Sequence, residues 1–269
     1  NSGGGLYVYA GGTATMTTVS FRGYMSVSSG GTATETTVNS WGRLSVSSGG
    51  TATDTTVNSR GVLHVFTGGT ATSTMVNSGG YLVVSGGTAS SAIVNASGKM
   101  YVESGIATST MVNSGGKMSV NNSTGIAHRT TVASGGGMSV YSGGRALATT
   151  INSGGWMSVF SNGMATNITV SSGGRLYVSN GGTATITFNP WQGTVYSSAG
   201  ATVTYLERDA NIYYGGYTCG LLSKTDMISQ KQIESGRSAV IFSGGTATET
   251  TVNSGGGLYV YAGGTATMT

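Results

Sequence analysis

The sequence predicts an all-β protein, a right-handed, single-stranded parallel β-helix with about 19 residues in each coil. Three observations support this prediction. A phrase such as VNSWGRLSVSSGGTATDTT (38–56) recurs along the chain at a nearly constant interval. Intervals near 20 residues are typical of solenoids, in which each repeat buries its apolar residues against its neighbours. The repeats are also rich in Gly, Ser, Thr and Val, which are poor helix formers, and no run shows a helical period.

The first extended piece of a repeat is exemplified by residues 43–46 (RLSV), which alternate polar and apolar side chains. Successive side chains of a strand point to opposite faces. We therefore expect Leu44 and Val46 to face inward, and Arg43 and Ser45 to face outward.

The second extended piece is exemplified by residues 51–57 (TATDTTV), with Ala52 and Val57 expected to face inward. These two residues differ in parity, so a bend or bulge must lie between them. Glycine pairs such as Gly49-Gly50 mark one corner, because glycine adopts positive φ at little steric cost. The NSxG segments mark another corner.

A β-branched or aromatic residue, expected to face inward, marks the start of each copy: Val19, Val38, Val57, Val76, Val94, Val112, Val132, Ile151, Val170 and Phe188. About 14 coils fit the chain, with neighbouring strands about 4.8 Å apart. Parallel crossovers are nearly always right-handed, hence the predicted hand. A leucine-rich repeat is disfavoured, because its characteristic leucine spacing is missing.

The chain is interpreted as a single β-helix over residues 1–269, with an irregular coil and a protruding loop at 206–231. The repeat pattern breaks after Phe188, and the next clear start is Ile233. Cys219, the only cysteine, lies in this segment, so no intrachain disulfide is possible. Both ends fall inside a repeat, and we expect the chain to be a piece of a longer array.

The composition argues against several functions. The net charge is +4, but the basic residues come about one per repeat and form no cluster, so no nucleic-acid partner is expected. Glu35, Asp54 and Glu249 share one repeat position that other copies fill with Ser or Met, which is a weak basis for an enzyme. His64 and His128 occupy different positions in their repeats. No enzyme activity, metal or cofactor is expected.

The asparagine of VNSGG recurs at one repeat position and is expected to form a ladder of stacked amides along the rod. Its members are Asn39, Asn58, Asn77, Asn95, Asn113, Asn152 and Asn253.

The serine beside this asparagine is the candidate functional residue. It precedes a glycine-rich turn in nearly every copy, and Phe21 replaces it once: Ser2, Ser40, Ser59, Ser78, Ser97, Ser114, Ser134, Ser153, Ser172, Ser235 and Ser254. A local hydrogen bond in a turn would also account for serine here. A hydroxyl repeated at one spacing is, however, a suitable acceptor for a modifying enzyme that recognises the shape of the corner and not its sequence. The SVSS hydroxyls are rival acceptors: Ser26, Ser28, Ser29, Ser45, Ser47 and Ser48.

A further ladder is expected on the outward side of the first strand, where aromatic residues and small hydroxyls form one flat, hydrogen-bonding face along the rod. Its members are Tyr7, Ser26, Ser45, His64, Val83, Tyr101, Ser119, Ser139, Ser158, Tyr177 and Tyr259.

The phrases SGGTATDTTVNSRG, SGGTATETTVNSWGRLSVSSGG and NSGGGLYVYAGGTAT resemble the passenger repeats of AIDA-type self-associating autotransporter adhesins. The resemblance covers nearly the whole chain apart from 206–231. It implies a bacterial surface protein, exported through an outer-membrane barrel, that mediates adhesion to host cells and autoaggregation, with self-association between passengers. It also implies O-linked heptose on passenger serines, added in the cytoplasm by a heptosyltransferase before export.

An ice-binding β-helix is the alternative function, because Thr-x-Thr pairs such as Thr51/Thr53 also stack into a flat array. Ser90, Arg145, Leu147 and Met164 interrupt that array, which disfavours lattice matching.

Overall fold

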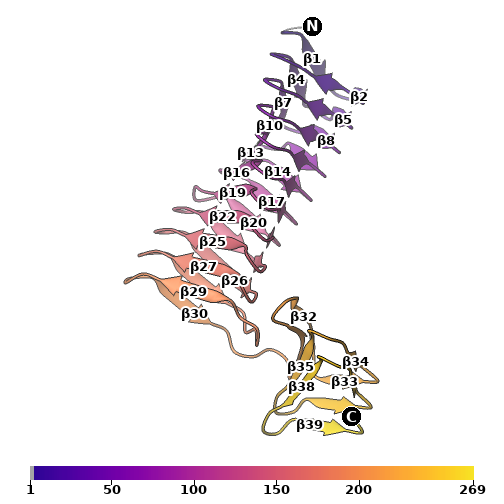
Figure 1. Cartoon of the computed structure of the whole chain (residues 1–269). Coiled ribbons are helices and arrows are strands. Elements are labelled where there is room, and N and C mark those ends of the chain that lie inside the picture. The colour runs from indigo at the N-terminus through magenta and orange to yellow at the C-terminus, as the bar shows by residue number, and fades with distance from the viewer. Residues whose placement is uncertain (1–2) are drawn as a thin grey trace.

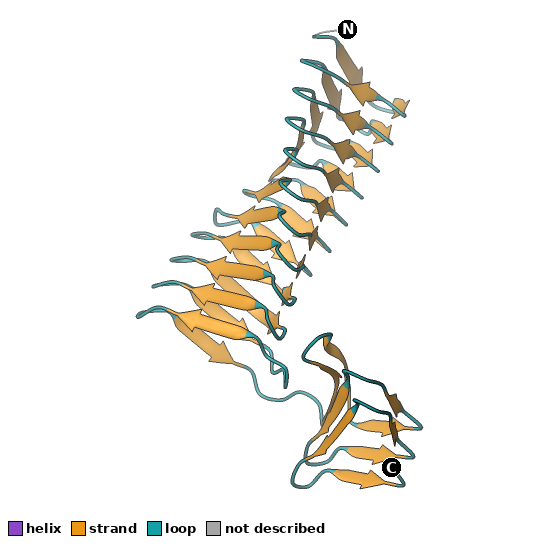
Figure 2. Cartoon of the chain, in the orientation of Figure 1, coloured by secondary structure: helices purple, strands orange, loops and turns teal. Residues whose placement is uncertain are grey.

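The computed structural model describes residues 3–269, and all regular elements in that range are strands (Figure 2). Within those residues, no helix has the length and apolar character needed to span a membrane. Most strands pair in parallel with the equivalent strand of the next coil, and they form a solenoid of about 14 turns (Figure 1). The predicted fold class is confirmed.

The first strand of each coil contributes to an 11-stranded parallel sheet. Its members are β1 (Gly5–Val8), β4 (Tyr24–Val27), β7 (Arg43–Val46), β10 (Val62–Phe66), β13 (Tyr81–Ser85), β16 (Lys99–Val102), β19 (Lys117–Val120), β22 (Gly137–Val140), β25 (Trp156–Val159), β27 (Arg175–Val178) and β29 (Thr194–Ser197).

The second extended piece of the repeat divides into two strands. The longer ones are β2 (Thr13–Thr15), β5 (Thr32–Thr34), β8 (Thr51–Thr53), β11 (Thr70–Thr72), β14 (Thr88–Ser90), β17 (Ile106–Thr108), β20 (Ile126–His128), β23 (Arg145–Leu147), β28 (Thr183–Ile186) and β30 (Thr202–Tyr205). The shorter ones are β3 (Thr18–Val19), β6 (Thr37–Val38), β9 (Thr56–Val57), β12 (Met75–Val76), β15 (Ile93–Val94), β18 (Met111–Val112), β21 (Thr131–Val132) and β24 (Thr150–Ile151). In one coil both pieces form the single strand β26 (Met164–Val170).

The bend required by the parity of Ala52 and Val57 lies at Asp54, whose φ is +52°. Glu35 and Ser73 hold the same left-handed conformation in the neighbouring coils. One left-handed residue reverses the alternation of the strand, so that Ala52 and Val57 are both fully buried. The expected bend is confirmed, and its position is now fixed.

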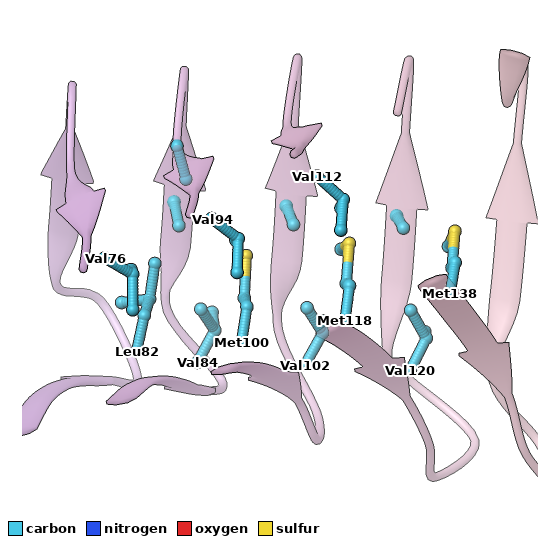
Figure 3. Close-up of a cluster of buried hydrophobic side chains, with 14 of the residues drawn as sticks. Val76, Leu82, Val84, Val94, Met100, Val102, Val112, Met118, Val120 and Met138 are labelled. Carbon is cyan, nitrogen blue, oxygen red and sulfur yellow. The ribbon is translucent and has the colours of Figure 1, made fainter. Parts of the chain in front are cut away.

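The core is a continuous column of aliphatic side chains between the sheets. The register places Leu44 between Met25 and Leu63, and all three are fully buried. Figure 3 shows the same stacking further along, where Leu82, Met100, Met118 and Met138 repeat on successive coils. Arg43 is exposed, as expected. Ser45 lies on the outer side of the strand, in register with Ser26 and His64, but it is only 6% exposed.

The parallel stack is interrupted after β30. The chain then forms an antiparallel hairpin within the segment 206–231 and begins a second, shorter stack (Figure 1). Its strands are β31 (Ile212–Gly216), β32 (Gly220–Thr225), β33 (Met227–Ser229), β34 (Gln232–Ile233), β35 (Ser238–Ile241), β36 (Thr246–Thr248), β37 (Thr251–Val252), β38 (Gly257–Val260) and β39 (Thr265–Thr267).

The expectation that Phe188 faces into the main core is wrong. The other nine predicted inward residues belong to the main core, but Phe188 is only half-buried and packs with Trp191, Tyr213 and Val240 between the two stacks.

Candidate functional site

The NSxG corner joins the short third strand of one coil to the first strand of the next. In the corner 39–42, the Gly42 amide donates to the Asn39 carbonyl at 2.8 Å, and the Gly61 amide donates to Asn58 in the same way. The third residue of the corner has positive φ, 63° at Trp41 and 60° at Arg60. The corner is therefore a tight turn with serine at its second position, where the side chain projects from the rod.

Most of the predicted corner serines lie at this second position and are exposed: Ser40, Ser59, Ser78, Ser114, Ser134, Ser153, Ser235 and Ser254. Ser172 has the same position but is half-buried. Ser2 lies outside the described residues.

Ser97 does not occupy the equivalent position. Its amide bonds to the Gly115 carbonyl and its carbonyl accepts from Gly79, which places it in the column of third corner residues. Ala96 fills the serine position of that coil, two residues after Val94. The position is set by the distance from the buried valine, so the expectation that Ser97 holds the same turn position as the other corner serines is wrong.

The asparagine ladder holds the corner in place and is confirmed over five coils. Each amide Nδ2 donates to the Oδ1 of the preceding coil at 2.9 Å, from Asn58 to Asn39 and onward through Asn77, Asn95 and Asn113. Ala133 then ends the series. Asn253 donates to Glu234 instead, at 3.1 Å. Because each amide fixes the next, the adjacent serines recur in one geometry.

The rival serines are less uniform. On the strand face, Ser45 is buried and Ser26 is half-buried, so neither presents a free hydroxyl comparable to the corner serines. At the other corner, Ser29 and Ser48 are exposed. Exposure thus disfavours the strand face and leaves two corners with accessible hydroxyls.

The outer face of the first sheet forms the expected ladder, with Tyr101, Ser119 and Ser139 in register. The ladder continues from Tyr177 to Tyr196, whose rings stack with centroids 4.9 Å apart. The threonine array is interrupted as expected, because Arg145 and Met164 are in register on neighbouring strands.

One polar cluster was not found from the sequence. His64 Nε2 and Ser85 Oγ are 2.8 Å apart, and the Ser85 hydroxyl donates to Glu103 at 3.1 Å. Burial lowers the pKa of His64, although the Glu103 carboxylate opposes the shift and Arg43 adds to it. The carboxylate contacts the hydroxyl and not the imidazole, unlike a serine–histidine–acid triad. The signal was hidden because Ser85 lies at a strand end beyond the repeated positions.

The carboxylates Glu35 and Asp54 occupy the same exposed bend position on neighbouring coils. His64 and His128 lie in different sheets. Among residues 3–269 no three His, Cys, Asp or Glu side chains gather as a metal site would require.

A comparison with protein families matches three stretches, residues 1–42, 41–80 and 101–155, to the probable stalk of adhesins of bacterial autotransporter systems. These stretches make up about half of the chain. The chain therefore belongs to the AIDA family of autotransporter adhesins, as the resemblance of its repeats predicted.

Among solved structures, the chain is similar to the crystal structure of a hyper-glycosylated fragment of TibA, whose glycosylation is catalysed by TibC. The two are 39% identical, with a TM-score of 0.68, over 99% of this chain and 88% of that one. No curated protein matches the chain.

Proposed function

We propose that this adhesin passenger is an O-glycosylated, non-enzymatic scaffold whose corner serines accept heptose from a heptosyltransferase. The observation that carries the proposal is the exposed serine held in one turn geometry on successive coils beside a hydrogen-bonded asparagine ladder. The glycosylated state of the similar TibA fragment supports the choice of modification.

The sugars extend a polar contact surface beyond the rod, and this surface serves adhesion to host cells and self-association between passengers. Modification takes place in the cytoplasm before export to the bacterial surface. The rod itself has few charges and no basic cluster, so its partners are cell surfaces and not nucleic acid.

The test is to produce the chain with and without a TibC-type heptosyltransferase and to compare the intact mass with 26.9 kDa. Replacing Ser40, Ser59, Ser78, Ser114 and Ser153 with Ala should remove several sugar masses and weaken cell aggregation. The fold should survive, because an exposed hydroxyl contributes at most about one modest hydrogen bond.

The matched control changes five exposed serines of the other corner to Ala: Ser29, Ser48, Ser142, Ser161 and Ser243. This control should retain its sugars. Sugar loss in the control, with full occupancy in the first variant, would transfer the acceptor role to the other corner. An unmodified chain in the presence of active transferase would contradict the proposed function.

A further inference from the structure

Each corner serine lies beside the third corner residue of the following coil. The third residues form their own hydrogen-bonded column, in which the Arg60 amide donates to Gly79 at 2.7 Å and the Gly79 amide donates to Ser97 at 3.1 Å. The column continues from Ser97 to Gly115 at 3.0 Å. Successive corners are therefore fixed relative to one another, and a residue of one coil controls the surroundings of a serine in the coil before it.

Where this third residue is glycine, the space beside the serine hydroxyl is free. A Cβ built on Gly79 would lie only 2.9 Å from Ser59 Oγ, and one on Gly135 would lie 2.5 Å from Ser114 Oγ. The corresponding distances are 2.5 Å from Gly154 to Ser134 and 2.6 Å from Gly255 to Ser235. Real Cβ atoms essentially never approach another heavy atom this closely, so a side chain there would displace the serine hydroxyl from the position that it holds beside glycine.

Two of the described corner serines have a residue with a side chain in this place. Arg60 lies in the third position above Ser40, and Ser97 lies in the third position above Ser78, both with positive φ of about 60°. The Arg60 guanidinium lies 5.1 Å from the ring centroid of Trp41, the neighbour of Ser40. The Arg60 side chain therefore extends across the coil that carries Ser40.

We propose that the third corner residue of the following coil selects which serines are glycosylated: Ser59, Ser114, Ser134, Ser153 and Ser235 accept sugar, whereas Ser40 and Ser78 are blocked. The inference rests on the proposed function. In the transfer, the serine Oγ forms a bond to the anomeric carbon of a nucleoside-diphosphate sugar. The bond from that carbon to the diphosphate breaks, and the hydroxyl proton passes to a base of the transferase. A side chain at the neighbouring third position displaces Oγ and obstructs this approach.

Selection by the folded corner can be distinguished from selection by the local sequence around each serine. A transferase that reads the residue after serine would prefer Ser78, which precedes Gly79, over Ser59, which precedes Arg60. A transferase that reads the folded corner would prefer Ser59. These two serines lie on adjacent coils of one rod, so they form an internal comparison.

The decisive variant is Ser97→Gly. It changes the residue above Ser78 and has no candidate serine as its neighbour in sequence, because Ala96 precedes it and Gly98 follows it. Its matched control is Ser91→Gly, the same substitution at an exposed residue of the same coil that also has positive φ, 54°. A second variant, Gly135→Ser, introduces a side chain above Ser114. Ser97 and Arg60 hold the same place in the column with positive φ, so a side chain is compatible with the fold there, although the φ of +72° at Gly135 makes the variant strained.

Each variant is produced with the transferase, its fold is checked by circular dichroism, and the sugar occupancy of each serine is measured by peptide mapping. In the unaltered chain, Ser59 should be modified several-fold more than Ser78. Ser97→Gly should raise Ser78 to the level of Ser59, Ser91→Gly should leave it unchanged, and Gly135→Ser should lower the occupancy of Ser114. Equal occupancy of Ser59 and Ser78, or no response of Ser78 to Ser97→Gly, would overturn the inference and leave the proposed function intact. A chain without sugar on any corner serine would overturn both.

Discussion

The long stack over residues 5–205 and the short stack over residues 212–267 share one repeat but bury their apolar side chains differently. The long stack has a single core of aliphatic residues that continues through successive coils. The short stack has small separate clusters, two of which contain the aromatic residues Tyr213 and Tyr214 of β31, while the third is built on Ile212 and Ile241. The difference shows what happens to a solenoid where its repeat is interrupted.

A coil of the long stack is completed by the coils on either side, whereas the short stack needs a cap at the end that faces the long one. The hairpin β31–β32 supplies this cap: β31 pairs antiparallel with β35 and is buried along its whole length. The last coil of the long stack, β29 and β30, has no such cover and is largely exposed. Terminal repeats of solenoids commonly need a different sequence for this purpose.

The largest expected effect tests the neighbour-dependent core of the long stack. Leu44→Asp places a carboxylate without a partner between Met25 and Leu63. Truncation of such a leucine to Ala already costs about 2–5 kcal/mol, and an unpaired buried charge costs more. Hydrogen–deuterium exchange should accelerate over residues 24–66 and stay unchanged over residues 212–260. Arg43→Ala, one residue away and facing outward, is the control. Equal effects of the two variants on melting would contradict the inward and outward assignment.

The second prediction tests the junction. Trp191 is 3% exposed and packs with Tyr213 and Val240 of the short stack. Trp191→Ala should cost about 3–5 kcal/mol, because it leaves a cavity in a small cluster. The loss should appear as faster exchange in the short stack, with the long stack still protected. Trp41→Ala is the matched control, since Trp41 is 55% exposed and its contact with Arg60 is worth about 0.5–1 kcal/mol. Destabilisation of the long stack by Trp191→Ala would show that the two stacks fold as one unit.

The third prediction concerns the asparagine ladder, which is continuous only in the long stack. Asn77 donates to Asn58 and accepts from Asn95, so Asn77→Ala leaves Asn58 Oδ1 without its donor and Asn95 Nδ2 without its acceptor. The expected cost is about 1–3 kcal/mol, measured as a lower Tm. Asn152→Ala should cost less, because Ala133 fills the preceding position and Asn152 has no amide neighbour on that side. Equal costs would mean that the amides act singly and not as a ladder.

The period, the parallel stacking and the inward residues were predictable because the core repeats the same residue types at fixed spacing. The alternation of polar and apolar residues is enough to predict that Leu44, Val46 and Val57 are buried. The asparagine ladder was predictable for the same reason, since identical side chains meet at identical positions.

The hairpin and the bend position were not predictable. The bend residues include Met16, Glu35, Asp54 and Ser73, which share no chemistry, so only the backbone reveals their common positive φ. The hairpin has no second copy in the chain, and its burial depends on contacts that sequence spacing does not encode. Ser97 was assigned to the wrong turn position because it was aligned with the corner serines of the other coils. The turn position is set by the distance from the buried Val94, and by that distance Ala96 is the equivalent residue.

The smallest expected effect compares one buried threonine in each stack. Thr55 follows the bend residue Asp54, is 1% exposed, and its hydroxyl has no hydrogen-bond partner. A buried hydroxyl without a partner is destabilising, whereas a methyl group of similar size is not. Thr55→Val should therefore raise the stability of the long stack by about 1 kcal/mol, seen as a higher Tm. Ala92 fills the same repeat position two coils later, which shows that the site accepts an apolar side chain.

The equivalent residue of the short stack is the control for this change. The Thr250 hydroxyl donates to the Thr248 carbonyl at 3.4 Å, so Thr250→Val loses a hydrogen bond and should give no gain. A lower Tm for Thr55→Val would show that its hydroxyl is hydrogen-bonded in solution, and the proposed difference between the bends of the two stacks would then be wrong. A higher Tm for Thr55→Val alone would instead show that the unpaired hydroxyl of Thr55 destabilises the bend of the long stack.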